Sequence, residues 1–379
     1  MPIFRVPGVL NSEQMDALIS RNMITWDSLP KPTLDCSSMD LRLADEAFEM
    51  TGGSVKPVRP SGRYKSYREF LETPELASPR SHRNDGTYLL GKKSTYVFRL
   101  EERLNTSLRE LGICGEATAK SSVGRVDVLA RLIVDGMDTY ESFSDRGLKE
   151  SSGEMFLEIT PITFNVLVRP GDSLSQLRFF YGKPDDALVK GGDFLQAIFP
   201  GTELPDGSLT VDLSEVDVKG EPAAAFCAEA RDEAIPLWED KTKNQSKPNP
   251  ADYWRRVRSS HNRLRIEKNK FYILRSREKI ALPDSIAVYC RTIGEMRIHY
   301  AGFVHPWWGL VRKDGSLRPE GEEGSPLIFE VRGHQVDVSL AHGEKMANLR
   351  FYRMSKDAPK GSTAYAEQTL QLSKFFAQW

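Results

Sequence analysis

The segment LEITPITFNVLVRPGDSLSQLRFFY at residues 157–181 aligns without gaps on FEVRGHQVDVSLAHGEKMANLRFYR at residues 329–353, an offset of 172 residues. Upstream, YVFRLEERL at 96–104 matches YILRSREKI at 272–280 at an offset of 176. Because the matched pieces occur in the same order, we infer a duplicated domain. We place the boundary near residue 200, which gives two domains, 1–200 and 201–379.

Short apolar runs broken by Gly, Pro, Asp and Asn fill most of both copies, for example VDVLARLIV, MFLEIT and SIAVYC. Strands of this length and spacing are typical of a β sandwich or a related barrel-like fold. The sequence therefore predicts a mainly β protein. One short N-terminal helix is expected within residues 8–24, where Asn11 or Ser12 is a suitable cap and apolar residues follow at helical spacing.

Composition excludes several classes of protein. The 52 Lys and Arg residues balance 53 Asp and Glu residues, so the chain lacks the positive charge that a general nucleic-acid binder needs. Four cysteines without a CxxC pair suit neither a disulfide framework nor a zinc ribbon, and a third ligand is not spaced to join His299 and His305. No long apolar run indicates a membrane span or signal peptide. We expect a cytoplasmic protein.

Copy one contains the hexapeptide Lys-Ser-Ser-Val-Gly-Arg at residues 120–125. Two hydroxyls between a lysine and an arginine, with a glycine that lets the backbone come close, are donors suited to phosphate oxygens. The alternative interpretation is a polar turn before the strand VDVLARLIV.

Glu158 follows Met-Phe-Leu and precedes Ile159, so alternation places a carboxylate on a strand with apolar neighbours. If its side chain points inward, loss of solvation raises its pKa and suits it to proton transfer. The alternative is an exposed residue or an ion pair with an arginine. Glu330 occupies the equivalent position in copy two and raises the same question.

Copy two contains GEMRIHYAGFVHPWWG at residues 294–309, a candidate hairpin whose aromatic rings fit a flat pocket for a base. Packing in the core is the alternative. The C-terminal stretch 362–376 is polar and is compatible with a mobile lid or with a packed terminus.

These pieces, in this order, resemble the dCTP deaminase branch of the dUTPase superfamily, in particular its two-domain bacterial form. The resemblance covers most of the chain. It rests on Ser37–Leu43 (S-x-D-x-R-L), Lys120–Arg125 (R-S-S-x-x-R), the strand Met155–Ile159, Ser175–Leu177, the hairpin Ala301–Gly309 and the tail from Tyr365 through Gln368 to Ser373.

The resemblance implies a dUTPase-like β-clip, a distorted jelly roll, in each half, and hydrolytic deamination of dCTP to dUTP and ammonia. Glu158 would be the general acid and base, with Ser121 and Arg125 orienting water or stabilising charge. Magnesium would accompany the triphosphate, and no zinc is expected because the H-x-E and P-C-x-x-C signature is missing. The implied nucleotide-binding residues are Lys120, Ser122, Gln176, Gly302, Val304, His305, Trp308, Tyr365 and Gln368.

The motifs are divided between the copies, since copy one lacks the hairpin and copy two lacks Ser-Ser-x-x-Arg. We therefore hypothesise a composite site in which Glu330, the hairpin and the tail of copy two meet the phosphate motif of copy one. Glu330 then competes with Glu158 for the catalytic role. A dUTP or dCTP diphosphatase, or a bifunctional enzyme, is one alternative, although His305 stands where the family hairpin has Asp, which argues against it. A catalytically silent nucleotide-binding regulator is another, because His305, Trp307 and Thr369 depart from the family pattern. Related single-domain proteins suggest a homo-oligomer, and we expect a trimer.

Overall fold

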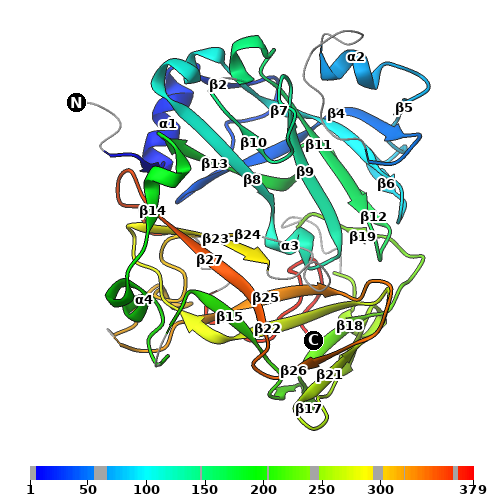
Figure 1. The fold of residues 1–379 in the computed structure, drawn as a ribbon. Helices are drawn as coiled ribbons and strands as arrows, with labels where there is room; N and C mark the ends of the chain where they lie inside the picture. The colour runs from blue at the N-terminus through cyan, green and yellow to red at the C-terminus, as the bar shows by residue number, and fades with distance from the viewer. Residues whose placement is uncertain are drawn as a thin grey trace.

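Two β-rich halves lie one above the other in the computed structural model, the N-terminal half in blue to green and the C-terminal half in green to red (Figure 1). This arrangement confirms the mainly β class. No helix in the portion described is both long enough and apolar enough to cross a membrane. The described residues are 6–54, 66–145, 147–202, 205–239, 247–292, 302–319, 321–361 and 366–379.

The first half is built on one antiparallel sheet with the strand order β10-β8-β13-β4-β7-β11-β9. Its elements are β1 (Gly8–Val9), α1 (Ser12–Ser20), β2 (Ile24–Trp26), β3 (Leu34–Asp35), β4 (Ser38–Met50), α2 (Tyr67–Leu71), β5 (Ala77–Arg80), β6 (Tyr88–Leu90), β7 (Tyr96–Leu104), β8 (Ile113–Ala119), α3 (Ser121–Gly124), β9 (Val128–Val134), β10 (Ser142–Phe143), β11 (Glu154–Pro161), β12 (Val166–Val168) and β13 (Ser173–Tyr181), with 3-10 turns at Thr106–Leu111 and Gly147–Glu150.

The second half repeats this plan in the order β20-β18-β22-β15-β27-β23-β24, and β25 also pairs with β22. Its elements are β14 (Leu188–Val189), α4 (Gly192–Ile198), β15 (Ser208–Asp212), β16 (Val216–Val218), β17 (Glu221–Ala223), β18 (Ala225–Ala228), β19 (Ile235–Pro236), β20 (Trp254–Val257), β21 (Arg263–Ile266), β22 (Phe271–Ile280), β23 (Ile286–Thr292), β24 (Gly302–Val304), β25 (Ser325–Arg332), β26 (Val338–Ala341) and β27 (Lys345–Arg353), with 3-10 turns at Pro184–Ala187 and Pro250–Asp252.

The N-terminal helix is shorter than the 8–24 window. Asn11 caps it with a capping box, in which its side chain accepts from the Gln14 amide and the Gln14 side chain accepts from the Asn11 amide. On either side the backbone joins a sheet instead, because Gly8 pairs with Tyr181 and Ile24 pairs with Leu104. Sheet pairing at both flanks therefore limits the helix to nine residues.

The internal repeat has the same strand register in both halves. Glu158 on β11 lies opposite Val97 on β7, and Glu330 on β25 lies opposite Ile273 on β22. Val97 and Ile273 are themselves matched at the offset of 176 in the sequence alignment. The two glutamates therefore occupy equivalent places in two copies of one sheet.

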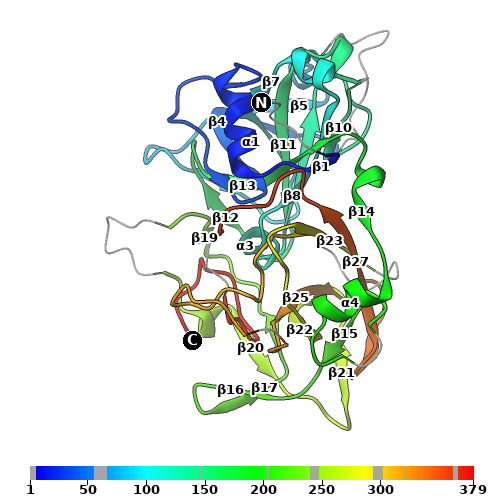
Figure 2. The same ribbon diagram turned by 90° about the vertical axis from the view of Figure 1, so that its left-hand side faces the viewer.

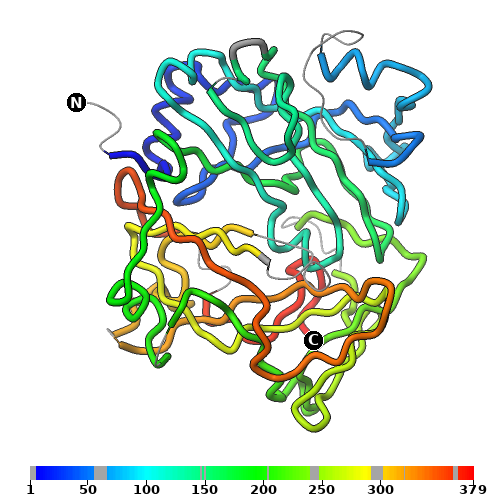
Figure 3. Tube along the Cα trace, viewed as in Figure 1, coloured from blue at the N-terminus to red at the C-terminus, as the bar shows by residue number. Residues whose placement is uncertain are grey.

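Strands and side chains cross between the halves. Strand β19 of the second half pairs with β12 of the first, and Val9 forms a bridge with Met354 where the two chain segments lie side by side (Figure 3). From the side, the C-terminal segment lies between α3 and β20 (Figure 2). Its apolar side chains, Leu370, Leu372, Phe375 and Phe376, join the main core cluster. Residues 366–379 are therefore a packed terminus rather than a lid.

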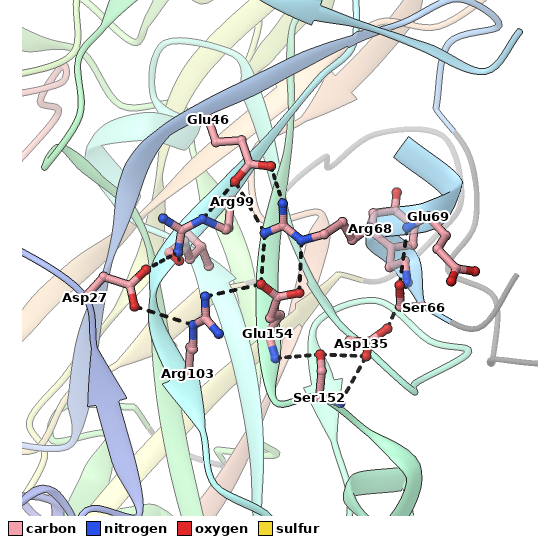
Figure 4. Close-up of polar contacts among 12 residues, drawn as sticks. Asp27, Glu46, Ser66, Arg68, Glu69, Arg99, Arg103, Asp135, Ser152 and Glu154 are labelled. Carbon is pink, nitrogen blue, oxygen red and sulfur yellow. Dashed lines mark hydrogen bonds and ion pairs between the residues drawn. The ribbon is translucent and has the colours of Figure 1, made fainter. Parts of the chain in front are cut away.

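An ion-pair network fastens helix α2 to the sheet of the first half (Figure 4). Arg68 on α2 lies between Glu46 on β4 and Glu154 on β11, at 2.6 and 2.9 Å. Arg99 continues the network from Glu46 to Asp27. Because α2 is only five residues long, these contacts and the apolar face beneath it hold the helix in place.

Candidate active site

A cavity at the junction of the halves is lined by both, and about 710 Å³ of space, part of it open to solvent, lies between its walls. A second lobe, with about 1040 Å³ of such space, adjoins it and shares Lys120, Ser121, Phe303 and Trp308 with the first. We call these the first and second lobes. The first lobe is completed by Ala119, Gly124, Arg125, Cys290, Gly302, Val304, Leu327, Ile328, Phe329, Glu330, Ala347 and Gln368.

The segment 120–125 enters the junction as the end of β8 and the short helix α3. Ser121 is exposed to the cavity, whereas Ser122 and Arg125 are almost fully buried. Arg125 Nη2 donates to Gln368 Oε1 at 2.9 Å, and Arg125 Nη1 donates to the Gln371 carbonyl at 3.3 Å. Ser373 Oγ donates to the Ser122 carbonyl at 2.6 Å. The packed C-terminal segment therefore holds the phosphate motif predicted from the sequence in one position.

Glu330 faces this segment from β25. A Cβ placed on Gly124 would lie 2.3 Å from Glu330 Oε2, so only glycine allows the carboxylate to approach so closely. Burial raises the pKa of Glu330 to about 8, although the nearby Arg125 opposes the shift. No hydrogen bond reaches the Glu330 carboxylate within the described part of the chain. The carboxyl group is thus buried, lines the first lobe and has a pKa near neutral pH.

The hairpin strand β24 and the turn after it form the opposite wall. Gly302, Val304 and Trp308 line the first lobe. Trp307 has a positive φ of 71° and directs its indole Nε1 to the Ala358 carbonyl at 3.0 Å. His299, Ala301 and Tyr365 of the sequence predictions lie outside the described residues.

His305 lies in the second lobe, in a hydrogen-bond chain. Its Nδ1 is 2.9 Å from Ser37 Oγ and its Nε2 is 3.2 Å from Gln176 Oε1. Burial, together with the charges of Arg178 and Lys120, lowers the pKa of His305 to about 4, although Asp35 opposes the shift. The ring is therefore neutral, and because an amide oxygen only accepts, Nε2 carries the proton and Ser37 donates to Nδ1.

The second lobe collects the polar groups that the resemblance assigns to phosphate. Lys120, Ser121, Ser122 and Gln176 line it together with Lys374. Lys120 Nζ forms an ion pair with Asp40 Oδ2 at 2.6 Å. Lys120 is thereby fixed at the wall that both lobes share.

Glu158 lies outside both lobes. Its side chain is 1% exposed, and it forms an ion pair with Arg131. Ser54 Oγ donates to it at 3.0 and 3.1 Å, and the Tyr140 hydroxyl donates at 3.0 Å. The structure therefore brings together Ser121, Arg125 and Glu330, and leaves Glu158 in the interior of the first half.

Sequence reasoning missed several residues of this junction. Arg178 is completely buried, and it donates to the carbonyls of Val288 at 2.9 Å and Val304 at 3.4 Å while its guanidinium lies 4.0 Å from the Phe303 ring centre. Cys290, beside Glu330, has a pKa raised to about 12 by burial and by that carboxylate. Arg178 belongs to the triplet Leu-Arg-Phe that the two aligned segments share, at residues 177–179 and 349–351. No sequence pattern pointed to Cys290.

The described residues contain no group of three or more His, Cys, Asp and Glu side chains arranged to hold a metal ion.

Family models match both halves of the chain. Residues 6–183 match the N-terminal domain, and residues 201–376 the C-terminal domain, of 2'-deoxycytidine 5'-triphosphate deaminase. The chain belongs to the dCTP deaminase family. Its fold is similar to that of a 2'-deoxycytidine 5'-triphosphate deaminase from Agrobacterium tumefaciens, with a TM-score of 0.78 and 24% identity over 93% of this chain and 97% of that chain. No curated protein matches the chain.

Membership of the dCTP deaminase family agrees with the resemblance seen in the sequence. In this family member, the cavity draws its lining from both matched domains. The first domain contributes hydroxyl groups and a guanidinium group to the lining, and the second domain contributes a carboxyl group.

Proposed function

We propose that the chain hydrolyses dCTP to dUTP and ammonia in the cavity between its halves, with Glu330 as the general acid and base. The observation that carries this assignment is the buried Glu330 carboxyl group, which faces Arg125 and Ser121 across the first lobe. A carboxyl group with a pKa near neutrality can both give and take a proton at neutral pH. Family membership supplies the substrate class.

The cytosine ring enters the first lobe in this proposal. Phe303, Trp308 and Leu327 offer flat and apolar surface for the ring, and Glu330 lies among them as the proton-transfer group. Glu330 protonates N3 of the ring, which makes C4 more electrophilic. The resulting carboxylate takes a proton from water as the water oxygen bonds to C4.

The same carboxyl group then gives that proton to the amino group, and the C4–N bond breaks as ammonia leaves. The remaining hydroxyl proton on C4 returns to Glu330 as the carbonyl forms. Each turnover thus consumes one water and restores the protonated glutamate. Ser121 orients the water, and Arg125 stabilises the negative charge that develops at the oxygen.

The triphosphate occupies the second lobe. Ser122 and Gln176 line this lobe, and Lys120 and Lys374 supply positive charge at its walls. Lys120 is already paired with Asp40, so much of its charge is neutralised before the ligand arrives. We propose that Mg²⁺ enters as the Mg–dCTP complex, held through phosphate oxygens, and that no zinc takes part.

The test is an assay of products from the wild-type chain. With dCTP and Mg²⁺, stoichiometric ammonia and dUTP are expected, without pyrophosphate. Pyrophosphate from dCTP or dUTP would support the diphosphatase alternative, and nucleotide binding without either product would support the silent regulator. A trimer, a cytoplasmic location and the lack of a nucleic-acid partner stay predictions from sequence, which light scattering, fractionation and a DNA-binding assay would check.

A further inference from the structure

A second polar contact joins the two halves beside the proposed catalytic pair. Asp127 is fully buried, and its Oδ2 accepts from Arg332 Nη2 and from Thr163 Oγ1. The Arg332 side chain is 11% exposed, and its Nη1 donates to the Asn269 carbonyl at 2.9 Å. The contact is therefore a largely desolvated ion pair between a residue of the first half and one of the second.

This pair stands in a simple relation to the proposed active site. Asp127 is two residues after Arg125, and Arg332 is two residues after Glu330 on β25. Residues two apart on a strand share a face and lie about 7 Å from each other. Arg125 thus lies near Glu330, and two residues further along the same face of β25 Asp127 lies against Arg332 in the same way.

The backbone of Asp127 links the pair to α3. Its φ of 57° is in the left-handed region, which turns the chain sharply after the helix. Its amide donates to the Gly124 carbonyl at 2.8 Å, and its carbonyl accepts from Ile162 at 2.9 Å. A shift of Asp127 would therefore move Gly124, the residue that touches Glu330.

Stability alone does not account for an ion pair in this place. Removing two charges from water costs about as much as their attraction returns, so buried pairs add little net stability, and their best-attested role is to fix one arrangement over others. The arrangement that this pair would fix is the position of α3 relative to β25.

The charge of Asp127 has a second consequence. Among the described residues, the charged and titratable groups beside Glu330 are Arg125 from the end of α3, Lys120 from the end of β8 and Cys290 from β23, with Arg332 two residues further along β25. Asp127 neutralises Arg332. Without Asp127, an unbalanced guanidinium would favour the ionised form of Glu330.

We propose that Asp127 and Arg332 are a positioning pair, which sets Glu330 against Gly124 and Arg125 and keeps the local charge balanced for proton transfer. The inference rests on the proposed function of Glu330. Neither residue lines the cavity lobes described above, so neither contacts substrate directly.

The test compares D127N with the wild-type chain. Asparagine keeps the size and one acceptor oxygen but removes the charge, so kcat should fall about tenfold. The alkaline limb of kcat/KM should also move to lower pH, by about one pH unit, as Arg332 stabilises the Glu330 carboxylate. A merely structural role would lower the melting temperature and leave that limb where it is.

Two further variants separate charge from geometry. D127N/R332M removes both charges, so the limb should return to its wild-type position while kcat stays low. R332K keeps the charge but loses the forked donor, so kcat should fall with the limb unmoved; this variant also serves if D127N does not fold. The matched control is D337N, which breaks the exposed Arg265–Asp337 pair of the second half and should change neither property.

The positioning role would be overturned if D127N had wild-type kcat and an unmoved alkaline limb, or if R332K had an unchanged kcat. Either result would leave the proposed function intact. A wild-type chain that releases no ammonia from dCTP would instead overturn the proposed function, and this inference with it.

Discussion

Glu158 and Glu330 hold the same position in two copies of one sheet, yet their surroundings differ in every respect that matters for chemistry. Around Glu158, Arg131, Ser54 and Tyr140 fill the acceptor positions of the carboxylate. Around Glu330, the described residues supply no hydrogen bond, and a cavity opens in front of it. Duplication conserved the strand and its register, and the two copies diverged in what covers the glutamate.

The covering elements explain that divergence. In the first half, helix α2 of the same half lies over the equivalent face, and its Tyr67 ring packs 5.3 Å from Phe156. In the second half, α3 arrives from the other copy and brings Gly124 against Glu330. Glu158 is covered by its own domain, whereas Glu330 lies at the junction of the two domains and lines the first lobe there.

Substituting each glutamate in turn tests most directly whether the two copies differ in function. E330Q should reduce kcat for ammonia release by about 10²- to 10⁴-fold, because glutamine cannot transfer the protons. E158Q should keep wild-type kcat per folded molecule. Since Arg131 would lose its partner at a partly exposed site, the free energy of unfolding should fall by about 1–3 kcal/mol. Activity would be measured by coupled ammonia detection and stability by urea unfolding.

The reverse result, inactive E158Q and active E330Q, would move the catalytic role back to the first half. Full activity in both variants would contradict the carboxylate mechanism itself.

A second pair of matched positions allows the two halves to be compared by the free energy of unfolding. Arg178 and Arg350 are matched in the alignment, but Arg178 is completely buried between the halves and Arg350 is exposed. R178M removes the donors of two buried carbonyls, at Val288 and Val304, so the free energy of unfolding should fall by about 2–4 kcal/mol. R350M should change it by less than about 0.5 kcal/mol.

Urea unfolding of both variants checks this pair. Equal losses would show that the two arginines still play one inherited role. A loss confined to R178M would place the divergence of the repeat at the junction of the halves.

Local sequence patterns predicted much of the fold. That the site is divided between the two halves could be stated from the sequence only as a hypothesis. The capped helix after Asn11 and the alternating strands depend on neighbours in the sequence, which a single chain reveals. The repeat placed Glu158 and Glu330 in equivalent strands. Neither pattern says which glutamate faces a cavity, because that depends on contacts between segments some 200 residues apart, such as Gly124 with Glu330.

The tail shows the same limit. Its polar composition was compatible with a lid, but four apolar side chains between residues 370 and 376 pack into the core and Gln368 binds Arg125. The largely buried ion pair of Asp127 with Arg332 was also outside the reach of sequence reasoning, since each residue has an unremarkable local context. Tertiary partners, rather than composition, decide these roles.

A smaller perturbation probes the contact between the copies directly. G124A adds one methyl group, whose carbon would lie 2.3 Å from Glu330 Oε2, so the carboxylate or α3 has to move. We expect kcat to fall about tenfold with little change in KM, because a displacement of about 1 Å at the reacting group is costly. The control is G52A, where an added Cβ meets nothing within 4 Å. Equal activity of G124A and the wild-type chain would contradict the tight contact.

The smallest expected effect needs no substitution and tests the state of Glu330 in the free protein. Burial raises the pKa of this group to about 8, so the protonated form that starts the reaction is present at pH 7 and is lost as the pH rises through about 8. The value of kcat/KM should therefore fall about twofold between pH 7 and pH 8, about fivefold between pH 8 and pH 9, and about tenfold for each further pH unit. Glu158 lies outside both lobes, so E158Q should give the same profile. A flat profile up to pH 9 would contradict a protonated Glu330 as the starting state, and a limb that moves in E158Q would show that the two copies are coupled after all.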